Sequence, residues 1–300
     1  MNAALPALAT ILMWSSLALL TDRISHLPPL LSVGLVLTVC GLAGAVRLRH
    51  WKVSPATWLV GVGGIFGYHF LLFAAFGRAP AVEANMIQYL WPLFIVLFTP
   101  LFLPGHRLTP GHLLGAALGL AGAGLIVTGG RLGLRMEYLP GYLCALGAAV
   151  IWACYSLGTK RLPPFPSSAV GGFCLVSGLL SLALHFATDG PGPAPSSGDW
   201  LIVLLLGCGP MGAAFYTWDA AMKRGDPRMI GALAYLTPML STLLLVAVNG
   251  RPFTVLHGAA VVLVTGGAVV GSLDSLRPLF ANLCAGRRRA WAGSSARPRK

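Results

Sequence analysis

The sequence predicts an all-α polytopic membrane protein with ten transmembrane helices, arranged as two inverted five-helix repeats around a central cavity. Three observations predict this class. Hydrophobic residues make up 56% of the 300 residues and charged residues 10%, too little polar material to coat a soluble globule. Apolar runs of about 18 to 25 residues recur along the chain, each long enough to cross a hydrocarbon layer of about 30 Å as a helix. The chain also matches itself at a nearly constant offset.

The ten helices are expected in the apolar runs, which Gly, Pro and charged residues separate. They span residues 4–21, 29–46, 57–77, 81–103, 111–129, 139–159, 166–187, 199–222, 227–248 and 254–273. The first run lacks the basic residues of a secretory signal, so we expect it to remain as the first helix. Sustained alternation of apolar and polar residues is not found, which disfavours a membrane β-barrel.

The self-match predicts an internal repeat. A shift of 138 residues places 13–24 on 151–162, and a shift of 146 places 61–92 on 207–238 without a gap. The matched residues include Trp14 and Trp152, Tyr89 and Tyr235, Pro92 and Pro238, and, at a shift of 145, His112 and His257. The sequence therefore predicts one half over residues 1–130 and a second over 139–273, followed by a basic cytoplasmic tail at 274–300.

The two predicted halves must have opposite orientations, because five helices are an odd number. Inverted repeats are typical of secondary transporters, whose substrate site lies near the bilayer midplane between the halves. Glycine-rich stretches at 61–67, 207–212 and 265–271, and the pair Gly115 and Gly119, are expected to let helices approach closely. A duplicated membrane protein without a transport role is the alternative.

Basic residues fall mostly on one side of the predicted membrane. Of the 21 Lys and Arg, 16 lie in loops and termini on one side and five on the other. The five are Arg23, Arg78, Arg131, Arg135 and Arg251. By the positive-inside rule, both termini are expected in the cytoplasm. The basic tail is expected to contact anionic lipid headgroups rather than nucleic acid.

The fourth predicted helix carries a polar stripe near its centre. Asn85, Gln88, Tyr89 and Pro92 stand at i, i+3, i+4 and i+7 and share one helix face. An unpaired amide in lipid is costly, so this face should look into protein or into a water-filled cavity. Proline removes a backbone hydrogen bond and frees a carbonyl one turn earlier. Helix kinks are expected at Pro92, Pro210 and Pro238.

Aromatic side chains near the centres of other predicted helices are expected to complete the wall of a pocket. Interfacial aromatic belts lie near helix ends, whereas these rings lie near helix centres. The predicted substrate-binding residues are Trp14, Tyr68, His69, Asn85, Gln88, Tyr89, Trp91, Trp152, Tyr155, Trp218 and Tyr235. Core packing is the alternative for each single ring.

Two titratable residues, His69 in the third predicted helix and Asp219 near the cytoplasmic end of the eighth, are candidates for a functional role. His69 has no acidic residue within reach in the sequence, so we expect a neutral imidazole bonded to a neighbouring helix, with proton transfer as the alternative. Asp219 is expected to pair with Lys223 at i+4, with a place at the pocket entrance as the alternative.

The sequence predicts no metal site, no cofactor and no enzyme. The six Cys are scattered, without CxxC or Cys/His spacing, which supports neither a disulfide framework nor a zinc site. All eight Asp and Glu lie near predicted helix ends. Catalysis within the membrane would need a paired acid, a nucleophile with its base, or a metal set at that depth.

Three stretches carry a resemblance to a known family. They are IQYLWPLFIVLF at 87–98, IWACYSLGTK at 151–160 and FYTWDAAMKRGDPRMIGALAYLTPMLST at 215–242. With the ten-helix layout, the chain up to about residue 273 resembles the EamA-type drug/metabolite transporters, most closely the bacterial inner-membrane aromatic amino acid exporter group. The resemblance implies export of amino acids and related metabolites through a central cavity between the halves.

The expected function is the export of amino acids, including aromatic or other apolar ones, by alternating access. Expected partners are the small-molecule substrate and the lipid bilayer, and one chain should function as a monomer. A nucleotide-sugar carrier is the alternative within the family, but its diphosphate would require Lys or Arg deep in the membrane, where the sequence has none. An intramembrane enzyme and a passive channel are alternatives of other classes.

Overall fold

The structure, a computed structural model, describes residues 3–131, 133–249, 254–271 and 273. Its elements in chain order are α1 Ala4–Ser15, α2 Leu17–Asp22, α3 Pro29–Gly44, η1 Ala45–Trp51, α4 Pro55–Phe76, α5 Ala81–Gln88, α6 Trp91–Phe102, α7 Pro110–Thr128, η2 Met136–Tyr138, α8 Leu139–Arg161, η3 Ser167–Ala169, α9 Val170–Thr188, α10 Ser197–Cys208, η4 Gly209–Ala213, α11 Ala214–Arg224, α12 Pro227–Ala234 and α13 Leu236–Asn249. A last helix covers Val255–Gly271.

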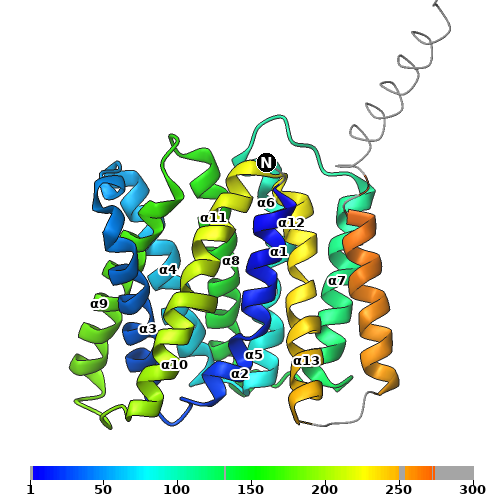
Figure 1. Cartoon of the computed structure of the whole chain (residues 1–300). Coiled ribbons are helices and arrows are strands. Elements are labelled where there is room, and N and C mark those ends of the chain that lie inside the picture. Colours follow the sequence, from blue (N-terminus) through cyan, green and yellow to red (C-terminus); the bar gives the residue numbers. More distant parts are fainter. Residues whose placement is uncertain (1–2, 132, 250–253, 272, 274–300) are drawn as a thin grey trace, which may run out of the picture.

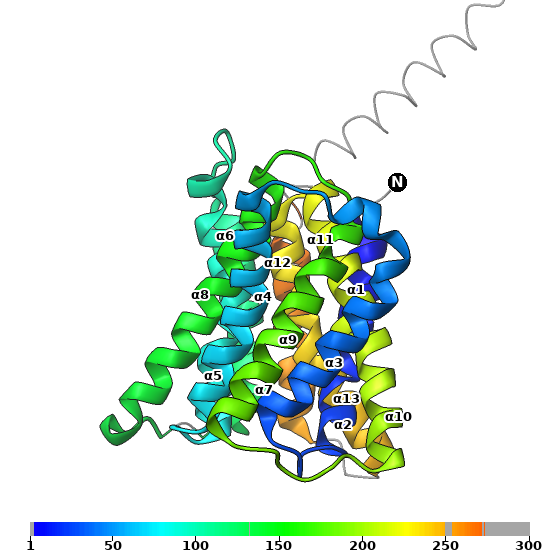
Figure 2. The same cartoon turned by 90° about the vertical axis from the view of Figure 1, so that its left-hand side faces the viewer.

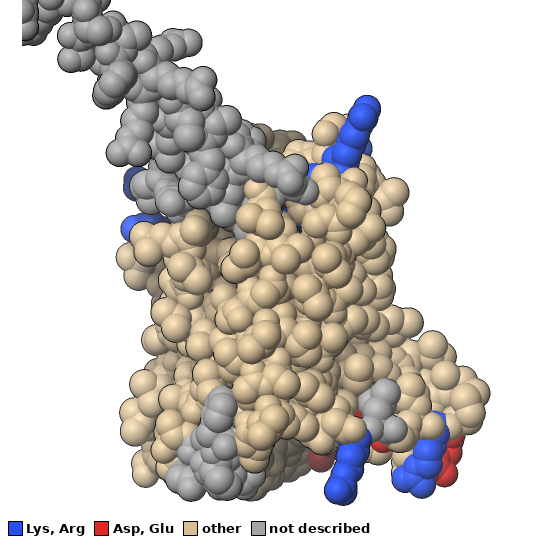
Figure 3. Space-filling view, turned by 90° about the vertical axis from the view of Figure 1, so that its right-hand side faces the viewer, with Lys and Arg blue, Asp and Glu red and all other residues tan. Residues whose placement is uncertain are grey.

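These elements form the ten predicted spans, so the prediction of an all-α membrane protein is confirmed. Eight continuous helical stretches, from Ala4–Asp22 to Ser197–Arg224, are long and apolar enough to cross a membrane. α12 with α13, and the helix Val255–Gly271, supply the ninth and tenth spans. On the face drawn in Figure 3, the charged side chains lie toward the two ends and leave an uncharged band between them, as a lipid belt requires.

The two halves run through the bundle in opposite directions. In Figure 1, α1 begins at the upper end beside the N-terminus and α2 ends at the lower end, whereas α8 begins at the lower end in Figure 2. The predicted inverted repeats are therefore present. We call the end that carries the N-terminus the N-terminal face, and the end that carries the loops at 23–28, 77–80 and 189–196 the opposite face.

Local signals in the sequence explain several helix starts. Ser54, before α4, accepts a hydrogen bond from the backbone N–H of Thr57. Thr109 and His112 form a reciprocal capping box at the start of α7, as do Ser196 and Asp199 at the start of α10. Proline occupies the first turn of α3, α4 and α7, where its missing N–H costs nothing. These caps fix the spans at the membrane surfaces.

Helices of the two halves pack closely where glycine removes the side chain. α3 packs along α9, and α4 packs along α8. A Cβ atom at Gly41 of α3 would lie 2.6 Å from a backbone atom of α9. A Cβ atom at Gly115 of α7 would lie 2.5 Å from the backbone of Gly271 in the last helix. The expectation that Gly115 and the stretch 265–271 provide close-approach surfaces is confirmed.

Four spans are interrupted near their midpoints. α1 gives way to α2 at Ser16, α5 to α6 at Tyr89 and Leu90, and α12 to α13 at Tyr235, while the π-helical turn η4 separates α10 from α11. Tyr89 and Tyr235 are matched residues of the repeat, so two of the interruptions are related by the internal symmetry. Pro92 lies in the first turn of α6, Pro238 in that of α13, and Pro210 within η4.

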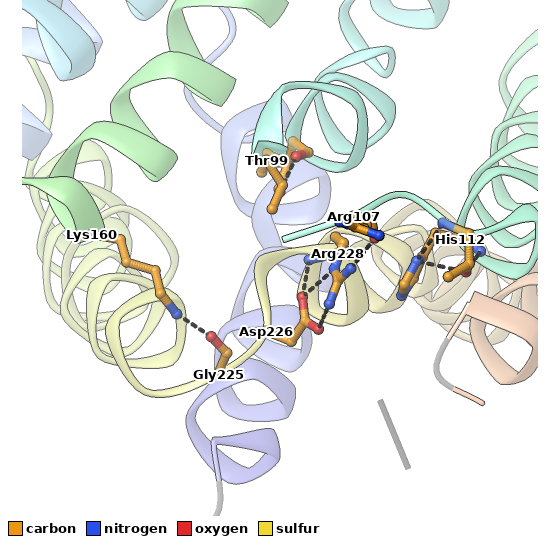
Figure 4. Close-up of polar contacts among 9 residues, drawn as sticks. Thr99, Arg107, His112, Lys160, Gly225, Asp226 and Arg228 are labelled. Carbon is orange, nitrogen blue, oxygen red and sulfur yellow. Dashed lines mark hydrogen bonds and ion pairs between the residues drawn. The ribbon is translucent and has the colours of Figure 1, made fainter. Parts of the chain in front are cut away.

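Basic side chains form hydrogen bonds with backbone carbonyls of loops and helix ends at the N-terminal face. α6 packs against α8 and α12 in this structure. Lys160, near the end of α8, donates a hydrogen bond to the carbonyl of Gly225, and Arg228 donates to the carbonyl of Arg107 (Figure 4). Arg161 donates to the last carbonyl of α6 over 2.8 Å. The two arginine bonds join the halves at this face, and the lysine bond joins α8 to the loop after α11 within the second half.

Candidate functional site

A cavity of about 540 Å³ lies at the centre of the bundle between the two halves. Its wall is built by α1 and α2, α3, α4, α5 and α6, α8, the segment from α10 to α11, and α13. Ile24, Ser25 and Leu27 line it in the loop at 23–28, so the cavity reaches the opposite face. Toward the N-terminal face, its lining ends at the level of Trp14, Trp91 and residues from α8 and α11.

Eight of the eleven predicted substrate-binding residues line this cavity. They are Trp14, Tyr68, His69, Asn85, Gln88, Tyr89, Trp91 and Trp152. Pro210 also lines it, because the turn η4 is exposed to the cavity. The spacing of the polar stripe brings Asn85, Gln88 and Tyr89 to one wall, since they lie within about one helical turn at the end of α5.

The other three predicted residues lie outside the lining. Trp218 is buried beneath the floor, and its Nε1 donates to the hydroxyl of Ser156 over 3.0 Å. The ring of Tyr155 packs 5.2 Å from that of Trp152 and supports the wall from behind. Tyr235 is fully buried against α7, where a Cβ atom at Gly119 would lie 2.4 Å from its ring.

Four tryptophans from four different spans form a cluster at the floor of the cavity, where three of them line it and Trp218 lies beneath. They are Trp14, Trp91, Trp152 and Trp218. Each of the four rings contacts the other three, with centroid distances between 5.1 and 6.4 Å and mostly edge-to-face geometry. This tryptophan cluster lies between the cavity and the N-terminal face, so it forms an apolar barrier there and an apolar floor to the cavity.

The polar groups of the cavity are neutral. Gln88 Nε2 donates to the hydroxyl of Tyr68 over 2.8 Å, which fixes both side chains on one wall. His69 Nδ1 is 2.7 Å from the carbonyl oxygen of Ile65 in its own helix, and not bonded to a neighbouring helix as the sequence analysis expected. A helical His can reach the carbonyl four residues earlier, and this bond leaves Nε2 available.

None of the residues that line the cavity within the described chain is Asp, Glu, Lys or Arg. Asp219 lies beyond the floor, and its Oδ2 accepts a hydrogen bond from Lys223 Nζ over 2.7 Å, which confirms the predicted i,i+4 pair. The ammonium group also lies 3.3 Å from the ring centroid of Phe165. The cavity therefore suits a ligand without net charge.

The sequence did not predict several of the residues that line the cavity. Phe73, Leu206, Met211 and Phe215 are ordinary apolar residues of membrane helices, and nothing in their spacing distinguishes a cavity wall from a helix contact. Thr237 also lines the cavity, one residue before Pro238. The internal repeat could have predicted this position, because a shift of 146 residues places Trp91, a predicted site residue, on Thr237.

Comparison with known proteins agrees with this architecture. A model of the EamA-like transporter family matches the chain twice, at residues 1–128 and 139–273. The chain belongs to the EamA-like transporter family. This membership identifies it as a multi-pass membrane protein of a transporter family and not an enzyme. The two matches of this EamA-like transporter correspond to the two inverted halves.

Several relatives of the chain are amino acid exporters. The aromatic amino acid exporter YddG of Ancylobacter novellus is 44% identical over 92% of this chain and 99% of its own length. YddG of Escherichia coli K12 is 26% identical over 92% of this chain and 98% of its own length. A probable terminal-alkyne amino-acid exporter of Streptantibioticus cattleyicolor is 28% identical over 64% of both chains. One solved crystal structure superposes with a TM-score of 0.84 at 44% identity, covering 90% of this chain and 97% of the other.

Proposed function

We propose that this EamA-like transporter exports amino acids, including aromatic ones, by alternating access of its two halves. The cavity carries the proposal, because it combines a tryptophan floor with a neutral polar wall and has no ionised lining residue in the described chain. An aromatic amino acid combines an apolar ring with a zwitterionic end of no net charge. The cavity offers a partner to each part. The similarity to the aromatic amino acid exporters YddG supports the same substrate class.

The substrate is proposed to place its side chain on the tryptophan cluster and its zwitterionic end against α5. Trp14, Trp91 and Trp152 supply the apolar contact area. Asn85 and Gln88 supply amide donors and acceptors on the facing wall. Backbone groups at the helix interruptions are suited to the charged ends of a zwitterion, as in other transporters with broken helices.

The proposed location is the bacterial inner membrane, with both termini in the cytoplasm. The excess of Lys and Arg on the side of the termini supports this orientation. The cavity would then reach the periplasmic face, which is the state expected for substrate release during export. One chain encloses the whole cavity, which supports function as a monomer.

Transport by the purified full-length chain in proteoliposomes tests the proposal. We expect saturable counterflow of radiolabelled phenylalanine that excess tryptophan or leucine inhibits and excess aspartate or lysine does not. Replacing Tyr89 and Trp152 by Ala together should abolish counterflow, because it removes the wall and the floor that hold the ring.

The matched control is Trp200→Ala. Trp200 lies on α10, is 43% exposed and does not line the cavity, so its loss should leave counterflow intact. Normal transport by the double variant, in protein that is inserted and monodisperse, contradicts the assigned cavity. Equal inhibition by charged and neutral amino acids contradicts the assigned substrate class.

A further inference from the structure

Two residues that line the cavity, Ser32 on α3 and Thr237 on α13, have a buried hydroxyl without a hydrogen-bond partner in the described part of the chain, and only Thr237 stands beside a helix interruption. Thr237, in the first turn of α13, is 7% exposed and lines the cavity. Among the residues that the structure describes, none bonds its hydroxyl oxygen. A buried hydroxyl without a partner is unfavourable, so its presence at a cavity wall calls for a physical reason.

The interruption of the ninth span separates this hydroxyl from its usual acceptor. Threonines inside the helices of this protein usually donate to the carbonyl four residues earlier, which satisfies them without a ligand. Those that do so are Thr10, Thr21, Thr99, Thr128, Thr188, Thr217 and Thr265. For Thr237 the corresponding residue is Leu233, which lies in α12 on the far side of the interruption at Tyr235.

The unpaired hydroxyl is therefore free to turn toward the cavity. Rotation about the Cα–Cβ bond of Thr237 breaks no hydrogen bond in the described structure, and a threonine in a helix has two accessible rotamers. The neighbouring lining residue on the same helix face is Ser241, four residues later. α13 thus presents a polar edge to the cavity.

The internal repeat gives this edge a specific place in the site. Thr237 is the symmetry mate of Trp91, which belongs to the tryptophan cluster. At the same position of the two halves, one half supplies an indole ring and the other a hydroxyl group. At this pair of matched positions, the first half contributes apolar surface and the second half a hydroxyl group.

From this geometry we infer that Thr237 binds the zwitterionic end of the substrate through its hydroxyl group, and thereby positions the side chain toward the tryptophan cluster. The inference rests on the proposed function and adds a binding residue on α13 to those on α5. The hydroxyl donates to the α-carboxylate or accepts from the α-ammonium group, either of which is common to all amino acids.

The test compares Thr237→Val, which keeps the shape and removes the hydroxyl, with Thr237→Ser, which keeps the hydroxyl. Loss of one hydrogen bond is expected to raise KM for phenylalanine about 3- to 10-fold in proteoliposome counterflow, with little change in the maximal rate. Thr237→Ser should remain within about 2-fold of the wild-type KM. The ratio of variant to wild-type KM should be the same for phenylalanine, tryptophan and leucine, because the zwitterionic end is common to them.

Thr38→Val is the matched control. The hydroxyl of Thr38 on α3 is also buried without a partner in the described part of the chain, but Thr38 does not line the cavity. Its replacement should leave KM unchanged. A wild-type KM for Thr237→Val, or an effect confined to one substrate, overturns the inference while leaving the proposed function intact. Absence of amino acid transport by the wild-type chain overturns both.

Discussion

Replacing Gly64 by Ala tests how closely the two halves meet beside the cavity. Gly64 lies on α4, and a Cβ atom there would fall 2.5 Å from the Cβ, Cγ and Cδ2 atoms of Tyr155 on α8. Its neighbour Gly63 has no atom of the described structure within 4 Å of the same position. The two residues share one helix turn, so Gly63→Ala is a control that differs in the contact alone.

The expected difference in the free energy of unfolding between the two variants follows from helix propensity and from overpacking. Ala is favoured over Gly inside a helix by up to about 1 kcal/mol, and this gain is common to both variants. Overpacking of a close helix contact costs about 1–3 kcal/mol, and only Gly64→Ala incurs this cost. Gly63→Ala should therefore be neutral or more stable than wild type, and Gly64→Ala should be less stable than Gly63→Ala by about 1–3 kcal/mol.

The measurement is thermal unfolding of the purified full-length chain in detergent. At about 2–4 °C per kcal/mol, the Tm of Gly64→Ala should fall roughly 2–12 °C below that of Gly63→Ala. The displaced ring of Tyr155 lies against Trp152, so Gly64→Ala should also raise KM for phenylalanine, whereas Gly63→Ala should not. Equal Tm values for the two variants would refute the close contact and the packing of α4 on α8 derived from it.

Two further outcomes follow from the described contacts. Lys160→Met removes the hydrogen bond to Gly225 at the N-terminal face. Maleimide labelling of Thr10→Cys in a cysteine-free background should then become about 3- to 10-fold faster. An unchanged labelling rate would contradict closure by this bond. Gly212→Ala would place a Cβ atom 1.6 Å from a carbonyl oxygen of the preceding turn, so this variant should lower Tm by several degrees. At Gly209 the same Cβ position has no neighbouring atom within 4 Å in the described structure, so Gly209→Ala should leave Tm unchanged.

The sequence predicted the ten spans because their signal is strong and local. Each is an apolar run of membrane length between Gly, Pro and charged residues, and the described helices begin and end near the expected residues. The basic tail at 274–300 lies outside the described residues. The interruption at Ser16 was not predicted, because no proline marks it. The hydroxyl of Ser16 donates to the carbonyl of Met13, a local bond that competes with the regular helix pattern.

The candidate site was predictable in part from helix spacing. Asn85 and Gln88 share one turn of α5 and line the cavity, and Tyr89, which lies at the interruption, lines it as well. Its repeat mate Tyr235 lies at the break between α12 and α13 but packs against α7. Matched positions of the two halves therefore have different surroundings, because the two halves have different conformations, and helix spacing alone cannot predict this difference.

The inverted repeat relates the closed face to the open one. A shift of 146 residues places α5 on α12 and α6 on α13. In this structure α6 packs against α12, whereas α5 and α13 diverge beside the cavity and each packs on α7. Exchanging the conformations of the two halves converts the contact of α6 with α12 into a contact of α5 with α13.

The opposite state of the transport cycle is therefore expected to bring α5 against α13 and to separate α6 from α12. Spin labels at Val82 and Val248, both exposed on the opposite face, should report this as a shorter distance, and labels at Leu101 and Arg228 as a longer one. Addition of substrate should change the two distances in opposite directions, one becoming shorter and the other longer in the same sample. Two distances that shorten or lengthen together would contradict an exchange between symmetric halves, because the tryptophan cluster lies between the pairs and only one side of it can be open at a time.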